Sequence, residues 1–361
     1  MIKKTIVMFL IISLTLFFNV DFATENFTRE TIIEQVINSS SAYDGIEDNL
    51  DILRQNITNL NNLIDYLKMT NFNSKNDADI LKYSIDNYGL KGEYQKLLNA
   101  KIKIDIQLEN AVDDILVNYF YLKDLVNIQP KYMEIQNDIF NLAKLNYDLG
   151  KTSKLEFENA AANYDIEKLN YDNLQYNYEM IKMQLREMLN IHYNDDFEVV
   201  DIRFENNILN LKSLDYYVSS AVEENIEILN LKIDKDIAEK NLKAYNLYGY
   251  EYYNLLKGKL GIFESDYNYN ETVKLINSKL NVKYEKILEQ YSEIYVENMD
   301  YKNELQKFEN SKLLYEEGKL DELNYSLLNY KIELKEYQIY NSKRNLNKLI
   351  YELENSIYYN N

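Results

Sequence analysis

The side chains that could do acid–base or metal chemistry are few in this sequence and do not form a recognisable set. The only histidine is His192, which lies just before Asp195 and Asp196. One imidazole beside two carboxylates could touch a metal ion, but a protein metal site needs several ligands at defined spacing, so we interpret this run as solvated linker polarity. Acidic pairs such as Asp113 and Asp114 are typical of solvated helix faces. Since phosphate loops, nucleophile elbows and metalloprotease motifs are also missing from the sequence, we predict a protein that is not an enzyme and needs no cofactor or metal.

The composition favours long helices over a sheet. The 361 residues are 46% apolar but include only eight glycines and one proline. Glycine and proline cost roughly 1 and 3 kcal/mol inside a helix, so their scarcity permits long helical runs. The formal net charge of -19 repels phosphate backbones and anionic lipid headgroups, which makes nucleic acid an unexpected partner. Disulfides and thiolate chemistry are excluded because the sequence has no cysteine.

Residues 1–24 carry a targeting signal. Two lysines precede an apolar run from Ile6 to Phe18, which is the pattern of a secretory signal peptide. The run is shorter than the roughly 20 residues of a membrane-spanning helix, which favours a cleaved peptide. Ala23 could precede the cut, but Asp21 then occupies a position that prefers a small residue, so an uncleaved anchor stays open as an alternative.

The sequence contains an internal repeat. Residues 143–158 (AKLNYDLGKTSKLEFE) and 311–326 (SKLLYEEGKLDELNYS) share Lys, Tyr, Gly, Lys and Leu at one offset. Upstream, residues 213–229 resemble residues 29–43. We therefore predict a first helical repeat at 25–191, a linker at 192–212 and a second helical repeat at 213–361.

Two apolar stripes follow each glycine. The first has the three-and-four spacing of a coiled coil, interrupted by Glu167 in one half and by Lys335 and Ser342 in the other. It consists of Phe157, Ala160, Tyr164, Tyr171, Leu174, Tyr178, Ile181, Leu185 and Met188, and of Tyr325, Leu328, Ile332, Ile339, Leu346, Leu349 and Leu353. The second lies beside it, at Leu155, Ala162, Ile166 and Leu169, and at Leu320, Leu323, Leu327, Tyr330, Leu334 and Tyr337. A helix with two apolar seams must contact a neighbour on either side, which favours a closed tube of helices.

Gly150 and Gly318 are the expected turns between helices. Glycine adopts the left-handed conformation that ends a helix, and the lysine after each one suits the negative end of the helix dipole. The alternative is a glycine tolerated within one continuous helix. Pro130 should kink the helix before Gly150 or start a new one, since it lacks the amide proton.

The motif A-x-x-x-Y-x-x-G-K-x-S-x-L-E at Ala143–Glu156, followed by a long amphipathic helix ending in QLREMLNI, resembles the repeat of the outer-membrane efflux (TolC) family. The second copy at 311–355 and the segment AVEENIEIL at 221–229 are similar to the second half of that family. The resemblance covers both halves of the chain.

This resemblance implies an all-α fold of long antiparallel helical hairpins in two tandem repeats, assembled as a homotrimeric α-barrel. It also implies partners: a periplasmic adaptor (membrane fusion) protein and an inner-membrane ABC or similar transporter. The adaptor would dock at the hairpin tips, which correspond here to Tyr147, Leu149, Gly150, Lys151, Thr152, Tyr315, Gly318, Lys319 and Leu320. Acidic residues that gate the family's entrance have possible counterparts in Asp321 and Glu322, although Asn324 departs from that pattern.

The windows in which the family has membrane strands are 69–100 and 245–271. The first window is polar and does not alternate. In the second, Tyr248, Tyr250 and Tyr252 alternate briefly, and residues 259–264 could pair back as a short hairpin, but a spanning strand needs roughly 9–11 alternating residues. We expect that the membrane strands have been lost or shortened to short remnants.

The leading hypothesis is a TolC-like efflux or secretion component that forms an extracytoplasmic helical conduit. It would be exported to the cell envelope, in the outer membrane if the host has one and otherwise extracytoplasmic and membrane-associated. Two alternatives remain open: a secreted or envelope-anchored helical scaffold that does not conduct, and a coiled-coil receptor or adhesin that resembles the family by accident.

Overall fold

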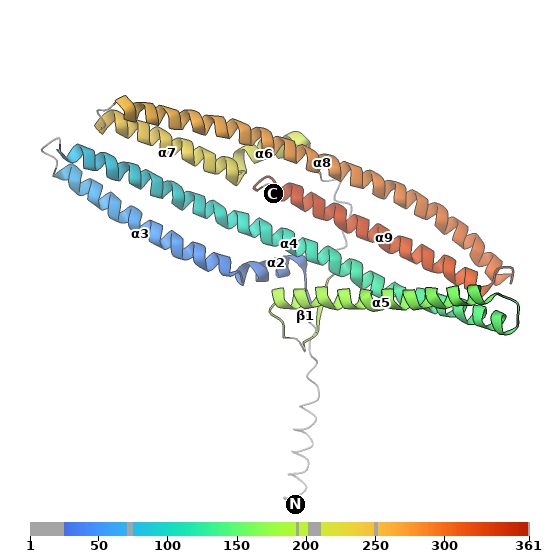
Figure 1. Cartoon of the computed structure of the whole chain (residues 1–361). Coiled ribbons are helices and arrows are strands. Elements are labelled where there is room, and N and C mark those ends of the chain that lie inside the picture. Colours follow the sequence, from blue (N-terminus) through green and yellow to red (C-terminus); the bar gives the residue numbers. More distant parts are fainter. Residues whose placement is uncertain (1–24, 71–74, 193–194, 201–210, 249–251, 360–361) are drawn as a thin grey trace, which may run out of the picture.

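The chain folds into a long rod of helices, seen from the side in Figure 1. The computed structural model describes all residues except 1–24, 71–74, 193–194, 201–210, 249–251 and 360–361. The expected signal peptide therefore lies outside the described residues. Within the described part of the chain, no helix is both long enough and apolar enough to cross a membrane.

The described elements contain the same succession of helices twice. The first repeat consists of β1 (Glu25–Phe27), α2 (Arg29–Asn38), α3 (Ser41–Met69), α4 (Lys75–Asp148) and α5 (Lys154–Met188). The second consists of α6 (Leu214–Glu224), α7 (Ile226–Tyr248), α8 (Tyr252–Glu316) and α9 (Glu322–Asn355), and β2 (Phe197–Val199) lies between the repeats. The predicted fold class of long antiparallel hairpins in tandem is confirmed.

Helix α4 determines the length of the rod. Its 74 residues extend for about 110 Å at roughly 1.5 Å per residue. Pro130 lies inside α4 and starts no new helix. Ile128 and Ile135, on either side of it, are both buried. This packing offsets the hydrogen bond that the proline removes.

Apart from Thr70, the residue that ends α3, the two windows in which strands were considered are helical wherever they are described. Residues 75–100 belong to α4, and α8 begins at Tyr252, so the short hairpin considered for residues 259–264 was wrong. Tyr248 ends α7, and Tyr250 lies outside the described residues. The alternation of tyrosines there extends over too few residues to outweigh the helical packing of α7 on α8.

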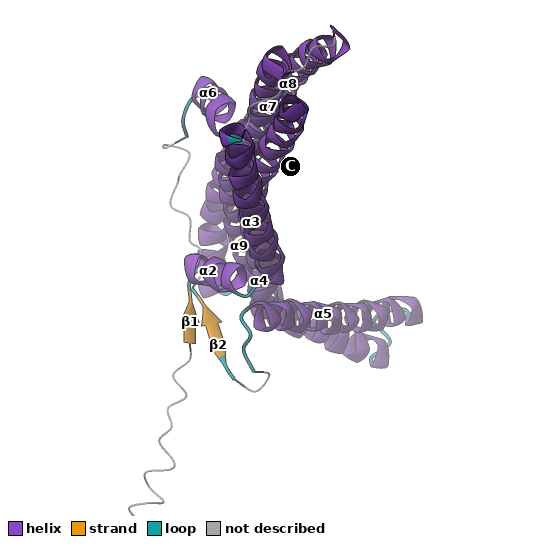
Figure 2. Cartoon of the chain, turned by 90° about the vertical axis from the view of Figure 1, so that its left-hand side faces the viewer, coloured by secondary structure: helices purple, strands orange, loops and turns teal. Residues whose placement is uncertain are grey.

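Two short strands lie near the middle of the rod (Figure 1), beneath α2 in the view along the rod (Figure 2). β1 and β2 pair in parallel, with Phe27 opposite Val199. The Phe27 and Phe197 rings pack edge to face with centroids 6.4 Å apart. The strands close one side of the core of the first repeat, which also takes in Val112 and Leu116 from α4 and Leu185 from α5.

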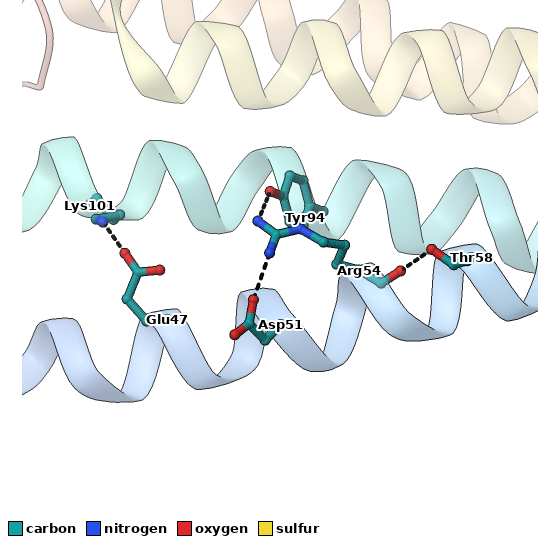
Figure 3. Close-up of polar contacts among 6 residues, drawn as sticks. All are labelled: Glu47, Asp51, Arg54, Thr58, Tyr94 and Lys101. Atoms are coloured by element: carbon teal, nitrogen blue, oxygen red, sulfur yellow. Dashed lines mark hydrogen bonds and ion pairs between the residues drawn. The ribbon is translucent and has the colours of Figure 1, made fainter.

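The α3–α4 pair shows how neighbouring helices are joined along their outer faces (Figure 3). The Arg54 guanidinium donates to Asp51 at 2.7 Å and to the Tyr94 hydroxyl at 3.1 Å, and Lys101 pairs with Glu47. Such exposed contacts are worth at most about 1 kcal/mol each. The pairing of the helices therefore depends chiefly on their buried apolar residues, which include Ile46, Leu50, Ile64 and Ile80.

The two repeats meet where α4 packs against both α7 and α9. Arg29 donates to both carboxylate oxygens of Asp113, at 2.5 and 2.7 Å, and its guanidinium lies 4.2 Å from the centre of the Tyr351 ring. Further along, Arg344 of α9 pairs with Asp124 of α4 at 2.7 Å. The Arg344–Asp124 pair and the contact of Arg29 with Tyr351 join the two repeats, whereas the Arg29–Asp113 pair joins α2 to α4 within the first repeat. Each pair is kept because an unpaired buried charge would cost several kcal/mol.

Candidate docking tips

The two glycine turns lie at the same end of the rod (Figure 1). Gly150 joins α4 to α5 with φ of +67°, and Gly318 joins α8 to α9 with φ of +69°. A Cβ atom is disfavoured in this left-handed region, so glycine is the residue that suits both turns. The predicted hairpin turns are confirmed, and the alternative of a continuous helix is excluded.

Both turns have the hydrogen bonds of a Schellman motif. At the first tip, the Gly150 amide donates to the Tyr147 carbonyl at 2.9 Å, and the Lys151 amide donates to the Asn146 carbonyl at 2.8 Å. The second tip repeats the pattern, from Gly318 to Tyr315 at 2.9 Å and from Lys319 to Leu314 at 2.8 Å. These bonds satisfy carbonyls that a helix end otherwise leaves without a partner.

Each tip then starts the return helix with a capping side chain. Ser153 and Glu156 form a capping box, and the hydroxyls of Thr152 and Ser153 also bond the Glu156 carboxylate. The Thr152 bond is the largest cause that lowers the pKa of Glu156. At the second tip, Asp321 accepts from the Asn324 amide at 2.9 Å, which lowers the pKa of Asp321.

Capping gives Asp321 a local structural role, and its possible role at the entrance stays a prediction. Its carboxylate also accepts from the Asn324 side-chain amide at 2.6 Å. Glu322 is different, because it is exposed in the first turn of α9 and has no hydrogen bond or ion pair with any described residue. Glu322 is therefore the acidic entrance candidate with a free side chain.

An aromatic ladder braces each tip. In the first hairpin, Phe157 stacks on Tyr147 at 5.3 Å and on Phe140 at 5.9 Å between ring centroids. The second hairpin stacks the corresponding residues: Tyr325 lies 4.4 Å from Tyr315 and 5.6 Å from Phe308. These stacks hold the two helices of each hairpin together up to the turn, so the tips are firmly supported.

The remaining tip residues face outward to different degrees. Leu149 is 57% exposed, and Lys151 is also exposed. Thr152 and Leu320 are half-buried, and the Lys319 ammonium pairs with Glu317 at 2.6 Å. Each tip thus presents a leucine and a lysine around a turn whose backbone is already satisfied.

A groove of about 380 Å³ lies between the hairpins, just behind the tips. Its walls come from α4 and α9, and it contains Ile135, Leu323 and Tyr330. Carboxylates of Glu134, Asp138 and Glu322 lie among its lining residues, whereas its one lysine, Lys131, pairs with Glu333 at 2.5 Å. The groove is therefore an acidic cleft with apolar residues in its walls.

The predicted site residues do come together at one end of the chain, but sequence reasoning missed two features. It did not identify the ladder partners Phe140 and Phe308, although they recur at the same offset as the two glycines. It also missed Glu134 and Asp138, since nothing in the sequence places that part of α4 opposite α9. The described residues contain no group of three His, Asp or Glu side chains that could hold a metal ion.

Comparison with known proteins finds neighbours by structure alone. No protein-family model matches the sequence, and no curated protein matches it either. Among solved structures, the open state of the MtrE outer membrane channel of Neisseria gonorrhoeae superposes with a TM-score of 0.63 at 10% identity, covering 92% of this chain and 90% of that one. CusC, whose crystal structures concern its folding and the formation of a transmembrane channel, superposes with a TM-score of 0.60 at 10% identity, covering 91% of this chain and 92% of that one.

The outer membrane protein VceC of Vibrio cholerae has a TM-score of 0.55 at 9% identity, over 91% of this chain and 94% of that one. These neighbours are channels and outer-membrane proteins, and none of the three is an enzyme. The match extends over nearly the whole length of both chains and includes both repeats. This chain therefore has the helical fold of the outer-membrane efflux (TolC) family, as the two glycine motifs predicted.

Proposed function

We propose that this chain is one subunit of an extracytoplasmic helical conduit for efflux or secretion, located in the cell envelope. In this proposal three copies close a tube. The glycine tips dock an adaptor protein that links the tube to an inner-membrane ABC or similar transporter. The helical fold and the exposed apolar side chains of α5 and α8 support this assignment.

The observation that carries the proposal is a difference between two equivalent seams. In α9, the second apolar seam packs on α4: Leu323, Leu327, Tyr330 and Leu334 surround a cluster that includes Ile128 and Ile135. In α5, the corresponding seam is open to solvent, with Leu155 65%, Ile166 53% and Leu169 62% exposed. The second apolar seam is therefore covered in α9 and exposed in α5.

A neighbouring copy can supply the missing cover. α8 forms the other edge of the helical layer and exposes Tyr291, Tyr295, Val296 and Met299 at 40, 62, 55 and 45%. If α5 of one copy packs on α8 of the next, each copy contacts its neighbour in the way that α9 contacts α4. Such a head-to-tail contact produces a closed ring when the rotation is right. A ring of rods encloses a central passage.

The tips supply the site for the adaptor. Their backbone is fixed by hydrogen bonds and aromatic stacking, so binding costs little ordering entropy. The groove beside them carries Glu134, Asp138 and Glu322. We therefore expect the adaptor to present basic residues next to an apolar contact.

A photocrosslinking experiment in the native host tests this function. A photoreactive amino acid at Leu149 should capture a membrane-anchored protein with a helical hairpin, and Gly150→Val with Gly318→Val should abolish capture. Leu275 of α8 is the matched control, because it is 54% exposed and Leu149 is 57% exposed. Equal capture from both positions, or no hairpin protein captured at Leu149, would refute the docking role.

A further inference from the structure

Each repeat has a break between two consecutive helices near the middle of the rod (Figure 1). α2 is followed by α3 in the first repeat, and α6 is followed by α7 in the second. Thr28 and Ser213 cap the helices before the breaks. At the same offset after these caps, Ser40 lies directly before α3 and Asn225 lies directly before α7. Ser40 and Asn225 are therefore equivalent positions, and the bonds around them can be compared.

The break between α6 and α7 is closed by hydrogen bonds. The amide of Ile226, the first residue of α7, donates to the Tyr358 carbonyl at 2.8 Å. Asn225 is fully buried, and its side-chain amide donates to the Ser356 carbonyl at 3.4 Å. The side-chain oxygen of Asn225 accepts from the Glu227 amide at 3.0 Å. The first two amides of α7, which a helix start otherwise leaves without a partner, are thus both satisfied.

We call residues 356–359, which follow α9, the clasp. They supply two of the bonds at the second break, and lysines of two other helices hold them in place. The Lys283 ammonium of α8 donates to the Ser356 hydroxyl at 2.7 Å. The Lys103 ammonium of α4 lies 4.7 Å from the centre of the Tyr359 ring. The clasp therefore joins the start of α7 to α4, α8 and α9.

The break between α2 and α3 is held differently. The side chain of Ser40 forms no capping hydrogen bond. The Ser39 and Ser40 amides donate back to carbonyls of α2. Leu189, which follows α5, accepts from Gln35 of α2. These bonds all lie on the α2 side of the break, so the first turn of α3 begins without a side-chain cap.

α3 also has less support along its length than α7. α3 packs chiefly against α4, whereas α7 packs against both α4 and α8. The buried apolar side chains of α3 are Ile46, Leu50 and Ile64, and most of its other described side chains are exposed. The polar contacts that join α3 to α4 in Figure 3 add little, because solvent screens exposed charges.

We propose that the clasp locks the start of α7, and that α3, which the described bonds of the clasp do not reach, opens from its start and makes the first repeat the movable one. A helix start that is bonded to a second segment opens only when those bonds break, whereas an uncapped start opens at little cost. Movement in the half of the rod away from the glycine tips is then confined to α3, with α7 as its fixed counterpart. The inference concerns a single copy and goes beyond the proposed conduit.

Hydrogen exchange of backbone amides tests the proposal, because the starts of α3 and α7 can be compared in the same molecules. In residues 25–361, the first amides of α3 should exchange about tenfold faster than those of α7 after correction for intrinsic rates, as expected for one net hydrogen bond. Asn225→Ala removes the bond to the clasp and the cap on Glu227, so it should remove most of this difference. Ser40→Ala is the matched control at the equivalent position and should leave the start of α3 unchanged, because this side chain caps nothing.

A second variant cuts the clasp without altering Asn225. A chain that ends at Ile357 lacks the Tyr358 carbonyl but keeps Ile357 in the core of the second repeat, so exchange should rise at the start of α7 while helicity is retained. Repeating the measurement in Ile166→Asp with Leu169→Asp excludes protection by a neighbouring copy. Two results would overturn the proposal: equal exchange at the starts of α3 and α7 in the unaltered chain, or no change at the start of α7 when the clasp is cut.

Discussion

At the two glycine turns, the backbone conformation decides whether a Gly→Ala substitution stabilises or destabilises the protein. Gly150 has a φ of +67°, and a Cβ added there would meet no atom within 4 Å. Gly150→Ala therefore introduces neither a clash nor a packing gain, and its cost is the strain of the left-handed backbone. That strain is about 1–2 kcal/mol for a residue with a Cβ. Gly318, with a φ of +69° and the same open surroundings, should behave alike.

Gly89 is the matched control for this substitution. It lies inside α4, and a Cβ added there also meets no atom within 4 Å. The left-handed glycines among the described residues are Gly150 and Gly318, so Gly89 has an ordinary helical backbone. Alanine is the better helix former by about 0.5–1 kcal/mol, so Gly89→Ala should stabilise the protein.

Urea unfolding followed by circular dichroism at 222 nm measures both effects. Protein concentration must be matched between variants, because assembly makes the unfolding midpoint concentration-dependent. We expect a lower midpoint for Gly150→Ala and a higher one for Gly89→Ala. If Gly150→Ala were neutral or stabilising, the turn would not require a left-handed residue and the assigned hairpin tip would be wrong.

Three further predictions concern packing and buried charge. Asp113→Ala should cost about 3–5 kcal/mol in urea unfolding because it leaves Arg29 buried without a partner, and Arg29→Met with Asp113→Leu should recover most of that loss; equal losses in both variants would contradict this. Burial raises the pKa of Asp105, so the stabilising contribution of its protonated carboxyl is complete below the ordinary pKa of Asp and is lost as pH rises through the raised pKa. Asp105→Asn should therefore reduce the decrease of the urea midpoint over this pH range. An unchanged pH profile would exclude the effect. Gly258→Ala places a Cβ 3.2 Å from the Leu242 Cα and should lower the midpoint, and no loss would show that α7 and α8 can separate freely.

Local sequence patterns were enough to predict the helices and their turns. Left-handed glycine and a capping residue act within a few positions of one another, so the Gly150 and Gly318 hairpins could be identified from the sequence alone. The seam residues had a regular spacing, and the structure places the second seam of α9 against α4.

Contacts between distant segments could not be predicted in the same way. The ion pair between Arg29 and Asp113 joins segments far apart in sequence, and each residue by itself looks like a solvated helix charge. The brief alternation near Tyr252 was weighed as a possible strand remnant, yet the packing of α8 on α7 makes the described part of it helical. Asp321 was a possible entrance residue by resemblance, and the structure adds a local role that the resemblance did not predict, because its carboxylate caps α9.

The native mass of residues 25–361 tests the central claim, that copies of this chain close a ring through the exposed seam of α5. It should be measured across a range of concentrations for the unaltered sequence and for Ile166→Asp with Leu169→Asp. The account predicts three copies for the former and dissociation for the latter, with helicity retained in both. A single copy at every concentration, with the α5 seam still exposed, would contradict it.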